Sequence, residues 1–196
     1  MKPEIEAKFM DIDIDDVRAR LTRAGASCTA PMRLMRRVLI ETEQMARDDA
    51  FVRLRDEGDK VTLTYKQFHG DQAHSASEHE VPVSGFDTAL EILKACGLMV
   101  QTYQESKRET WQLGECEVVI DEWPWMNPYI EIEGESEAAV KKTAGLLGFD
   151  WAAVVFGGAD VIYQRMFPRM TVRGVIDVPE VRFGDPVPKV FGKQLQ

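Results

Sequence analysis

Three charged residues alternate with apolar ones near the start of the chain, where residues 4–9 read Glu-Ile-Glu-Ala-Lys-Phe. Successive side chains of a β-strand point to opposite faces, so Glu4, Glu6 and Lys8 would share one face. Carboxylate oxygens suit Mg²⁺ or Mn²⁺, and a cationic side chain suits phosphate oxygens. Such a face could therefore bind a metal and a phosphate together. Taken alone, it could equally be a salt-bridge ladder on a solvated strand.

Paired charges recur two positions apart in later segments that read as strands. Apolar residues occupy the alternate positions, so if the apolar faces pack outward against helices, the charged faces converge on an interior. A closed antiparallel β-barrel satisfies this arrangement and removes the edges of the sheet. The charged residues concerned are Arg53, Arg55, Lys66, Glu78, Glu80, Glu131 and Glu133, with Asp121 at the end of a further strand.

An interior lined by so many charges is costly unless the charges are paired, hydrated or bound to a ligand. Acidic and basic linings together predict a metal-bound polyphosphate, because Mg²⁺ typically combines a few carboxylates with substrate phosphates and waters. The alternative is solvated strand faces held by cross-strand ion pairs worth about 0.2–1 kcal/mol each. That alternative weakens because like charges on one face repel each other without a counterion.

The elements that would position these residues follow from periodicity. Helical spacing of apolar residues predicts helices over 13–26, 86–96 and 137–147, with Asp13 and Ser136 as N-caps. After Pro168 the periodicity is lost, which predicts a domain over 1–168 and a C-terminal extension without its own core over 169–196. Strands are predicted over 38–41, 50–56, 60–67, 77–83, 107–113, 117–121 and 129–134.

Composition excludes several classes of protein. With 196 residues and 44% hydrophobic content, the chain can bury the core of one substantial domain. A net charge of -9 disfavours DNA and RNA as partners. No apolar run approaches the length of a membrane helix, and the charged start lacks the apolar stretch of a signal peptide, so we expect a cytoplasmic protein that does not bind membranes. Cys28, Cys96 and Cys116 lack the spacing of a disulfide framework or a cysteine zinc site.

The ordered set of charges resembles the CYTH family, also called triphosphate tunnel metalloenzymes, over the chain up to about Pro168. The opening ExExK signature of the family is matched by Glu4, Glu6 and Lys8. Arg53 and Arg55 resemble the paired basic strand of the family, and Lys66 resembles the lysine of the strand that follows it. Glu78 and Glu80 resemble the central acidic strand, and residues Arg108 to Trp111 resemble the later Arg-x-x-aromatic strand. Asp121, followed by Glu131 and Glu133, resembles the Asp and the Glu-x-Glu that end the family's set.

The resemblance implies an α+β fold in which a closed antiparallel tunnel of about eight strands has its helices packed outside. By analogy, the phosphates of the substrate would contact Lys8, Arg53, Arg55, Lys66 and Arg108. A metal, Mg²⁺ or Mn²⁺, would be held by carboxylates among Glu4, Glu6, Glu78, Glu80, Asp121, Glu131 and Glu133, although not all of them can touch it. The catalytic set would be Glu4, Glu6, Lys8, Arg53 and Arg55.

Three departures from the family pattern stand out. Where members often carry Asp-x-Tyr-aromatic, residues 36–41 read Arg-Arg-Val-Leu-Ile-Glu. Ser106 stands where a lysine is common, and Lys107 is out of phase with that position. The usual Gly-rich turn is replaced by residues 123–128, which read Trp-Pro-Trp-Met-Asn-Pro. Trp123 and Trp125 could stack on a nucleobase at the mouth of the tunnel, or they could pack the loop or the tail.

The predicted function is that of a metal-dependent triphosphatase acting on inorganic triphosphate, thiamine triphosphate or a nucleoside triphosphate such as ATP. Hydrolysis needs only the tunnel, whereas the first alternative, a class IV adenylyl cyclase that makes cyclic AMP and pyrophosphate, also needs a site for base and ribose. A second alternative is a polyphosphate- or nucleotide-binding module without catalysis. The expected partner is a small triphosphate-containing molecule, and a homodimer stays open.

Overall fold

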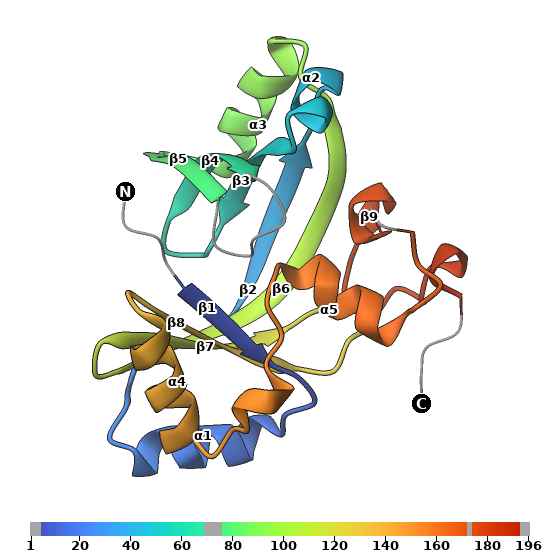
Figure 1. The fold of residues 1–196 in the computed structure, drawn as a ribbon. Coiled ribbons are helices and arrows are strands. Elements are labelled where there is room, and N and C mark those ends of the chain that lie inside the picture. The colour runs from blue at the N-terminus through green and yellow to red at the C-terminus, as the bar shows by residue number, and fades with distance from the viewer. Residues whose placement is uncertain (1–4, 69–75, 172–173, 193–196) are drawn as a thin grey trace.

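The computed structural model describes residues 5–68, 76–171 and 174–192, which form one curved sheet with helices around it (Figure 1). The helices of the described residues are α1 (Ile14–Arg23), α2 (Glu43–Arg47), α3 (Phe86–Ala95), α4 (Glu137–Leu146) and α5 (Ala159–Met166). The strands are β1 (Ile5–Phe9), β2 (Ser27–Ile40), β3 (Ala50–Asp56), β4 (Val61–Phe68), β5 (Ala76–Val83), β6 (Val100–Leu113), β7 (Cys116–Glu122), β8 (Tyr129–Gly134) and β9 (Glu180–Val181). None of these helices has the length and apolar character needed to cross a membrane.

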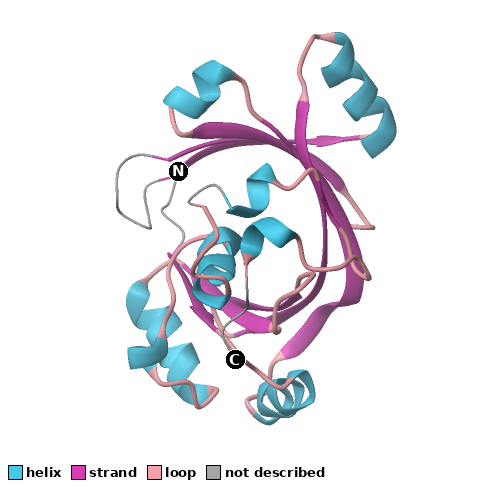
Figure 2. Ribbon diagram, turned by 90° about the vertical axis from the view of Figure 1, so that its right-hand side faces the viewer, coloured by secondary structure: helices cyan, strands magenta, loops and turns pink. Residues whose placement is uncertain are grey.

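The sheet is curved but open, which corrects the predicted closed barrel and leaves the α+β class confirmed (Figure 2). Its order is β1-β8-β7-β6-β2-β3-β4-β5, and within the described residues no backbone pairing joins β1 to β5. The edge of β1 is partly covered instead, because Lys8 and Val155 exchange backbone hydrogen bonds of 3.0 and 2.9 Å. Alternating polarity indicates which face lies inside, whereas closure depends on strand number and stagger, which alternation does not encode.

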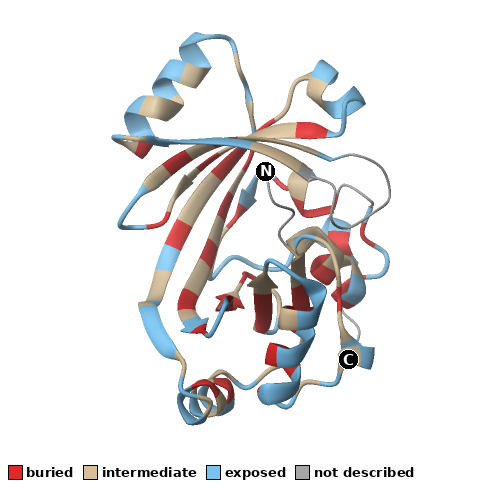
Figure 3. Ribbon diagram, turned by 60° about the vertical axis from the view of Figure 1, so that its left-hand side comes forward, coloured by how far each residue is buried: buried red, intermediate tan, exposed pale blue. Residues whose placement is uncertain are grey.

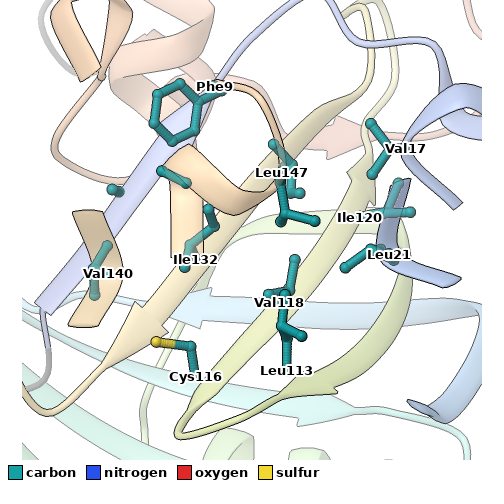
Figure 4. Packing of buried hydrophobic residues seen from close by; sticks show 13 residues of the cluster. Phe9, Val17, Leu21, Leu113, Cys116, Val118, Ile120, Ile132, Val140 and Leu147 are labelled. Atoms are coloured by element: carbon teal, nitrogen blue, oxygen red, sulfur yellow. The ribbon is translucent and has the colours of Figure 1, made fainter. Parts of the chain in front are cut away.

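The apolar faces of the strands point outward onto helices, as the sequence predicts. Ile120 and Ile132 (Figure 4), together with Ile130, are fully buried against Val17 and Leu21 of α1, Val140 of α4, and Leu147, which directly follows α4. On the other half of the sheet, α3 packs Phe86 onto Val38 and Leu54. The opposite side of α3 is exposed (Figure 3). Helices α1, α3 and α4 thus hold the sheet from its convex side and leave the concave side to the charged residues.

The predicted helices are confirmed as α1, α3 and α4, and Asp13 and Ser136 cap α1 and α4 by accepting hydrogen bonds from the backbone N–H groups of Asp16 and Ala139. All seven predicted strands are present, but β2 and β6 are 14 residues long each and extend well beyond the predicted ranges. The pairing of β2 with β6 shifts register around Pro31, which has no N–H to donate. Helices α2 and α5 and strand β9 were not predicted.

The C-terminal segment, residues 159–192 as far as they are described, lies at one end of the curved sheet (right in Figure 1). Strand β9 pairs in parallel with β6, placing Glu180 opposite Tyr103 and Val181 opposite Gln104. Phe191 is 0% exposed and contacts the rings of Trp125 and Tyr163, with centroid distances of 5.7 and 5.8 Å. The buried residues of 174–192 thus share one apolar cluster with Trp123 and Tyr129. The division of the chain at residue 168 stays a prediction.

The packing of Phe191 predicts that the tail contributes to overall stability. Phe191→Leu should lower the free energy of unfolding by about 1–2 kcal/mol, because it removes part of a buried ring and leaves a small cavity. The neighbouring Val190 is 66% exposed, so Val190→Ala should change it by less than about 0.5 kcal/mol. Urea denaturation followed by tryptophan fluorescence measures both. Equal stability of the two variants would show that the tail unfolds separately from the domain.

Candidate site on the concave face

The register of the sheet places the predicted charged residues on one face, the concave one. Directly paired residues of neighbouring antiparallel strands lie on the same face. Lys8 pairs with Glu131, and Arg108 pairs with Asp121. Glu4 lies outside the described residues. The remaining predicted residues share this face, which we call the interior face: Glu6, Lys8, Arg53, Arg55, Lys66, Glu78, Glu80, Arg108, Asp121, Glu131 and Glu133.

Lys8 lies between two carboxylates at the β1–β8 end of the interior face. Its Nζ is 2.9 Å from Glu6 Oε1 and 3.3 Å from Glu131 Oε2. Burial lowers the pKa of Lys8, but the charges of Glu131 and Glu6 outweigh burial and raise it. Burial and the nearby Glu131 raise the pKa of Glu6. Burial also acts to raise the pKa of Glu131, but Lys8 and Arg108 bring it down to about 2. Lys8 therefore stays charged, and Glu6 is the more basic carboxylate.

Arg108 and Asp121 form a two-pronged ion pair beside this cluster. Arg108 Nε and Nη2 donate to the two carboxylate oxygens of Asp121 at 2.7 and 2.6 Å, and Asp121 is 1% exposed. Arg108 Nη2 also lies 3.8 Å from Glu131 Oε2. Both oxygens of Asp121 are thus engaged, and a metal ion would compete with Arg108 for them. This geometry favours a role for Asp121 in holding Arg108 in place.

The arginines of β3 are less well compensated. Arg53 Nη2 lies 3.7 Å from Glu80 Oε2 and donates to Thr64 Oγ1 at 3.5 Å, both long contacts. Arg55 Nη2 lies 2.6 Å from Glu57 Oε1. Within the described chain, the buried Nε atoms of Arg53 and Arg55 have no hydrogen-bond partner. Burial and the charge of Arg55 lower the pKa of Arg53 to about 10, so its positive charge lacks compensation.

At the β4–β5 end of the interior face, acid and base are paired again. Lys66 Nζ lies 2.6 Å from Glu78 Oε1, and Thr64 Oγ1 donates to Glu80 Oε2 at 2.7 Å. Burial acts to raise the pKa of Glu78, but the contact with Lys66 lowers it overall. The predicted carboxylates therefore fall into two groups at opposite ends of the strand order, with the arginines of β3 and β6 on strands between them.

The carboxylates suit a hard divalent cation that shares its coordination with substrate. In the described ranges, no group of three acidic, histidine or cysteine side chains is close enough to hold a metal ion unaided. Mg²⁺ is usually bound by one or two carboxylates plus substrate phosphates. Glu6 and Glu131 could provide the carboxylates. The raised pKa of Glu6 supports this fit, because two neighbouring carboxylates favour a shared cation over mutual repulsion.

Sequence reasoning did not place Arg37, Gln104 or Trp123 among the phosphate-binding residues: Arg37 appeared only within a departure from the family pattern, Trp123 only as a candidate for stacking or packing, and Gln104 not at all. The register puts Arg37 opposite both Arg55 and Gln104, and hence on the interior face. Arg37 Nε donates to Gln104 Oε1 at 2.8 Å, and its guanidinium carbon lies 4.3 Å from the centre of the Trp123 ring. Arg37 and Gln104 lie in the parts of β2 and β6 that were not predicted. Extending β6 backwards from Arg108 by twos would have found Gln104.

The two tryptophans of the loop before β8 pack the C-terminal part of the protein, one of the two predicted alternatives. Trp123 meets Tyr163 edge-on at 6.4 Å. Trp125 meets Phe191 edge-on, and its Nε1 donates to the backbone oxygen of Asp185 at 2.6 Å. Lys107, which was expected to be out of phase, pairs with Glu122 and lies on the convex face.

The fold and the site together define an α+β protein whose curved sheet gathers basic and acidic side chains on its concave face. The family model of the CYTH domain matches residues 2–147 of the chain. The chain therefore belongs to the CYTH family, whose members are triphosphate-processing enzymes that generally depend on metal. No curated protein matches it significantly.

Solved structures support the same fold. A conserved hypothetical protein of Pyrococcus furiosus is 21% identical, with a TM-score of 0.65 over 78% of this chain and 94% of that one. A "putative adenylate cyclase" of Vibrio parahaemolyticus is 14% identical, with a TM-score of 0.68 over 82% of this chain and 98% of that one. A cyclase-like protein of Hippeastrum, described as having a dominant triphosphatase activity, is 12% identical, with a TM-score of 0.56 over 81% of this chain and 91% of that one.

Proposed function

We propose that the protein is a metal-dependent triphosphatase, which removes the terminal phosphate of inorganic triphosphate or of an organic or nucleoside triphosphate. The observation that carries the proposal is that Arg53 and Arg55, whose buried Nε atoms have no hydrogen-bond partner among the described residues, lie on the same concave face as the carboxylate pair Glu6 and Glu131. A ligand that contacts both groups needs anionic oxygens for the arginines and a bridging cation for the carboxylates. A metal-bound polyphosphate has both.

The residues have distinct roles in this proposal. Lys8, Arg53, Arg55, Lys66 and Arg108 hold the phosphate chain and stabilise the negative charge that develops on it. A carboxylate of the interior face that does not hold the metal accepts a proton from the attacking water while the oxygen of that water bonds to the terminal phosphorus. The bond from that phosphorus to the bridging oxygen breaks, and the shortened phosphate chain leaves. Glu6 and Glu131 would hold the metal, which would neutralise charge on the phosphates when bound.

The hydrolase is preferred to the class IV adenylyl cyclase because the two tryptophans that were candidates for stacking on a nucleobase have other packing partners. Trp123 and Trp125, the residues that could have stacked on a nucleobase, pack against Arg37, Tyr163 and Phe191. The Hippeastrum relative, described as having a dominant triphosphatase activity, supports the same preference.

The purified protein tests the proposal when it is incubated with inorganic triphosphate, thiamine triphosphate and ATP, each with Mg²⁺ and with Mn²⁺. We expect metal-dependent release of orthophosphate, and ADP plus orthophosphate from ATP. Cyclic AMP plus pyrophosphate would select the cyclase, and binding without turnover would select the binding module. Absence of turnover on all three substrates with both metals would refute the hydrolase.

A further inference from the structure

Arg37 carries a charge that the described residues do not neutralise. Its one charged or polar contact among them is the hydrogen bond from Nε to Gln104 Oε1, and no carboxylate there lies within ion-pair distance. Arg55 is its neighbour across the strand pair. Burial, followed by the charges of Arg53 and Arg55, lowers the pKa of Arg37 to about 9. An arginine keeps its proton under ordinary conditions, so Arg37 is a buried cation beside two further arginines, an environment that a bound anion would stabilise.

Two buried donors next to Arg37 also lack acceptors. Gln104 is 1% exposed and Trp123 is 5% exposed, and neither Gln104 Nε2 nor Trp123 Nε1 has a partner within the described chain. The orientation of the Gln104 amide is set by Arg37, because a guanidinium can only donate and therefore must face the amide oxygen. Leaving a buried donor unpaired is unfavourable, so such groups usually mark a water or ligand.

A small cavity of about 20 Å³ opens beside these groups. Its lining includes Arg37, Arg55, Ser106, Arg108 and Trp123, and no acidic residue of the described chain contributes to it. The volume is enough for about one water-sized group, such as a phosphoryl oxygen. Beyond Trp123 lie Tyr163 and the C-terminal segment, which occupy that end of the sheet (in front of the interior in Figure 2).

We propose that Arg37 and Trp123, with Gln104 holding the guanidinium of Arg37 in place, form a subsite for an oxygen of the free terminal phosphoryl group of the substrate. The inference rests on the proposed function and specifies its substrate class. A phosphoryl oxygen in this pocket accepts hydrogen bonds from the guanidinium of Arg37 and from the indole N–H of Trp123, which otherwise has no acceptor among the described residues. Because the C-terminal segment lies behind Trp123, an organic group cannot extend past the subsite. Substrates must therefore present an unesterified phosphate at this end, whatever they carry at the other.

Binding measurements without metal isolate the subsite from catalysis. Titration calorimetry in EDTA compares inorganic triphosphate binding to the wild type, Arg37→Met, Trp123→Phe and Lys107→Met. Arg37→Met should weaken binding about 30-fold or more, since it removes a charged partner. Trp123→Phe keeps the ring and removes one N–H donor, so a loss of about 3- to 10-fold is expected. Lys107→Met removes the same charge from the convex face and should stay within about twofold.

A second comparison tests the substrate class. The wild type should bind ATP at least about tenfold more tightly than diadenosine triphosphate, which has a nucleoside on both ends and no free phosphoryl group. Arg37→Met should lose most of that discrimination. Circular dichroism confirms that each variant is folded, and Trp123→Phe gives the answer if Arg37→Met does not fold.

The two proposals fail in different ways. If the wild type neither binds nor hydrolyses any triphosphate, the proposed function itself is wrong. If the wild type binds and hydrolyses triphosphate, but Arg37→Met and Trp123→Phe bind as Lys107→Met does, the function stands and the subsite is refuted. Equal binding of ATP and diadenosine triphosphate by the wild type would likewise refute it.

Discussion

Arg53→Met is expected to lower kcat/KM for the triphosphate substrate by about 100- to 1000-fold, the effect of losing a charge-assisted contact in an enclosed site. Its stability should not fall, because Arg53 has only long contacts to Glu80 and Thr64 and is destabilised by its neighbour Arg55. Removing the side chain relieves that repulsion. Steady-state kinetics and urea denaturation of the same preparation measure the two effects separately.

The control is Arg47→Met on α2, where the arginine is 63% exposed and pairs only loosely with Glu43. It removes one positive charge far from the interior face and should leave kcat/KM within about twofold of the wild type. If Arg53→Met and Arg47→Met are equally active, Arg53 does not bind substrate, and the assignment of the basic residues must be revised.

Arg108→Met is expected to lower the free energy of unfolding by about 3–5 kcal/mol, the range for breaking a buried ion pair from one side. Asp121 accepts both hydrogen bonds of this pair and would be left buried without its partner. Activity should also be lost, so kinetics alone cannot separate the two roles of Arg108. Chemical denaturation distinguishes the two arginines, because the free energy of unfolding should fall in Arg108→Met and not in Arg53→Met.

The double variant Arg108→Met/Asp121→Leu serves as the control for this prediction. It replaces the pair with apolar side chains and should recover most of the lost stability, because no charge is left unpaired. A double variant as unstable as Arg108→Met alone would show that packing around Arg108, and not the stranded carboxylate, causes the loss.

The alternation of charged and apolar residues was sufficient to predict the strands and to place their charged residues on one face. This worked for β3 and β8, where Arg53 alternates with apolar neighbours and Glu131 does the same. It failed for the first half of β6, in which both faces are polar because the outer face meets the C-terminal segment through Glu105 and Tyr103. The alternation of apolar and polar residues therefore could not predict that Gln104 belongs to a strand or faces the interior.

The C-terminal segment was unpredictable for a related reason. Its apolar residues, such as Val181 and Phe191, are widely spaced and have no period of their own. Their burial depends on packing against the tryptophan loop and the free side of β6, which are distant in sequence. Arg37 was likewise noticed only as a departure from a family pattern, and its environment depends on contacts from three separate parts of the chain.

The open sheet has a consequence for how the interior responds to its contents. A closed barrel has a diameter dictated by its number of strands and their stagger. Here β1 and β5 are not tied together in the described residues, so the spacing between Lys8 on one margin and Glu78 on the other depends on the bend of the middle strands. We expect that this bend can change without breaking a hydrogen bond between neighbouring strands. We therefore expect the same residues to bind ligands of different width at little cost in the free energy of the sheet.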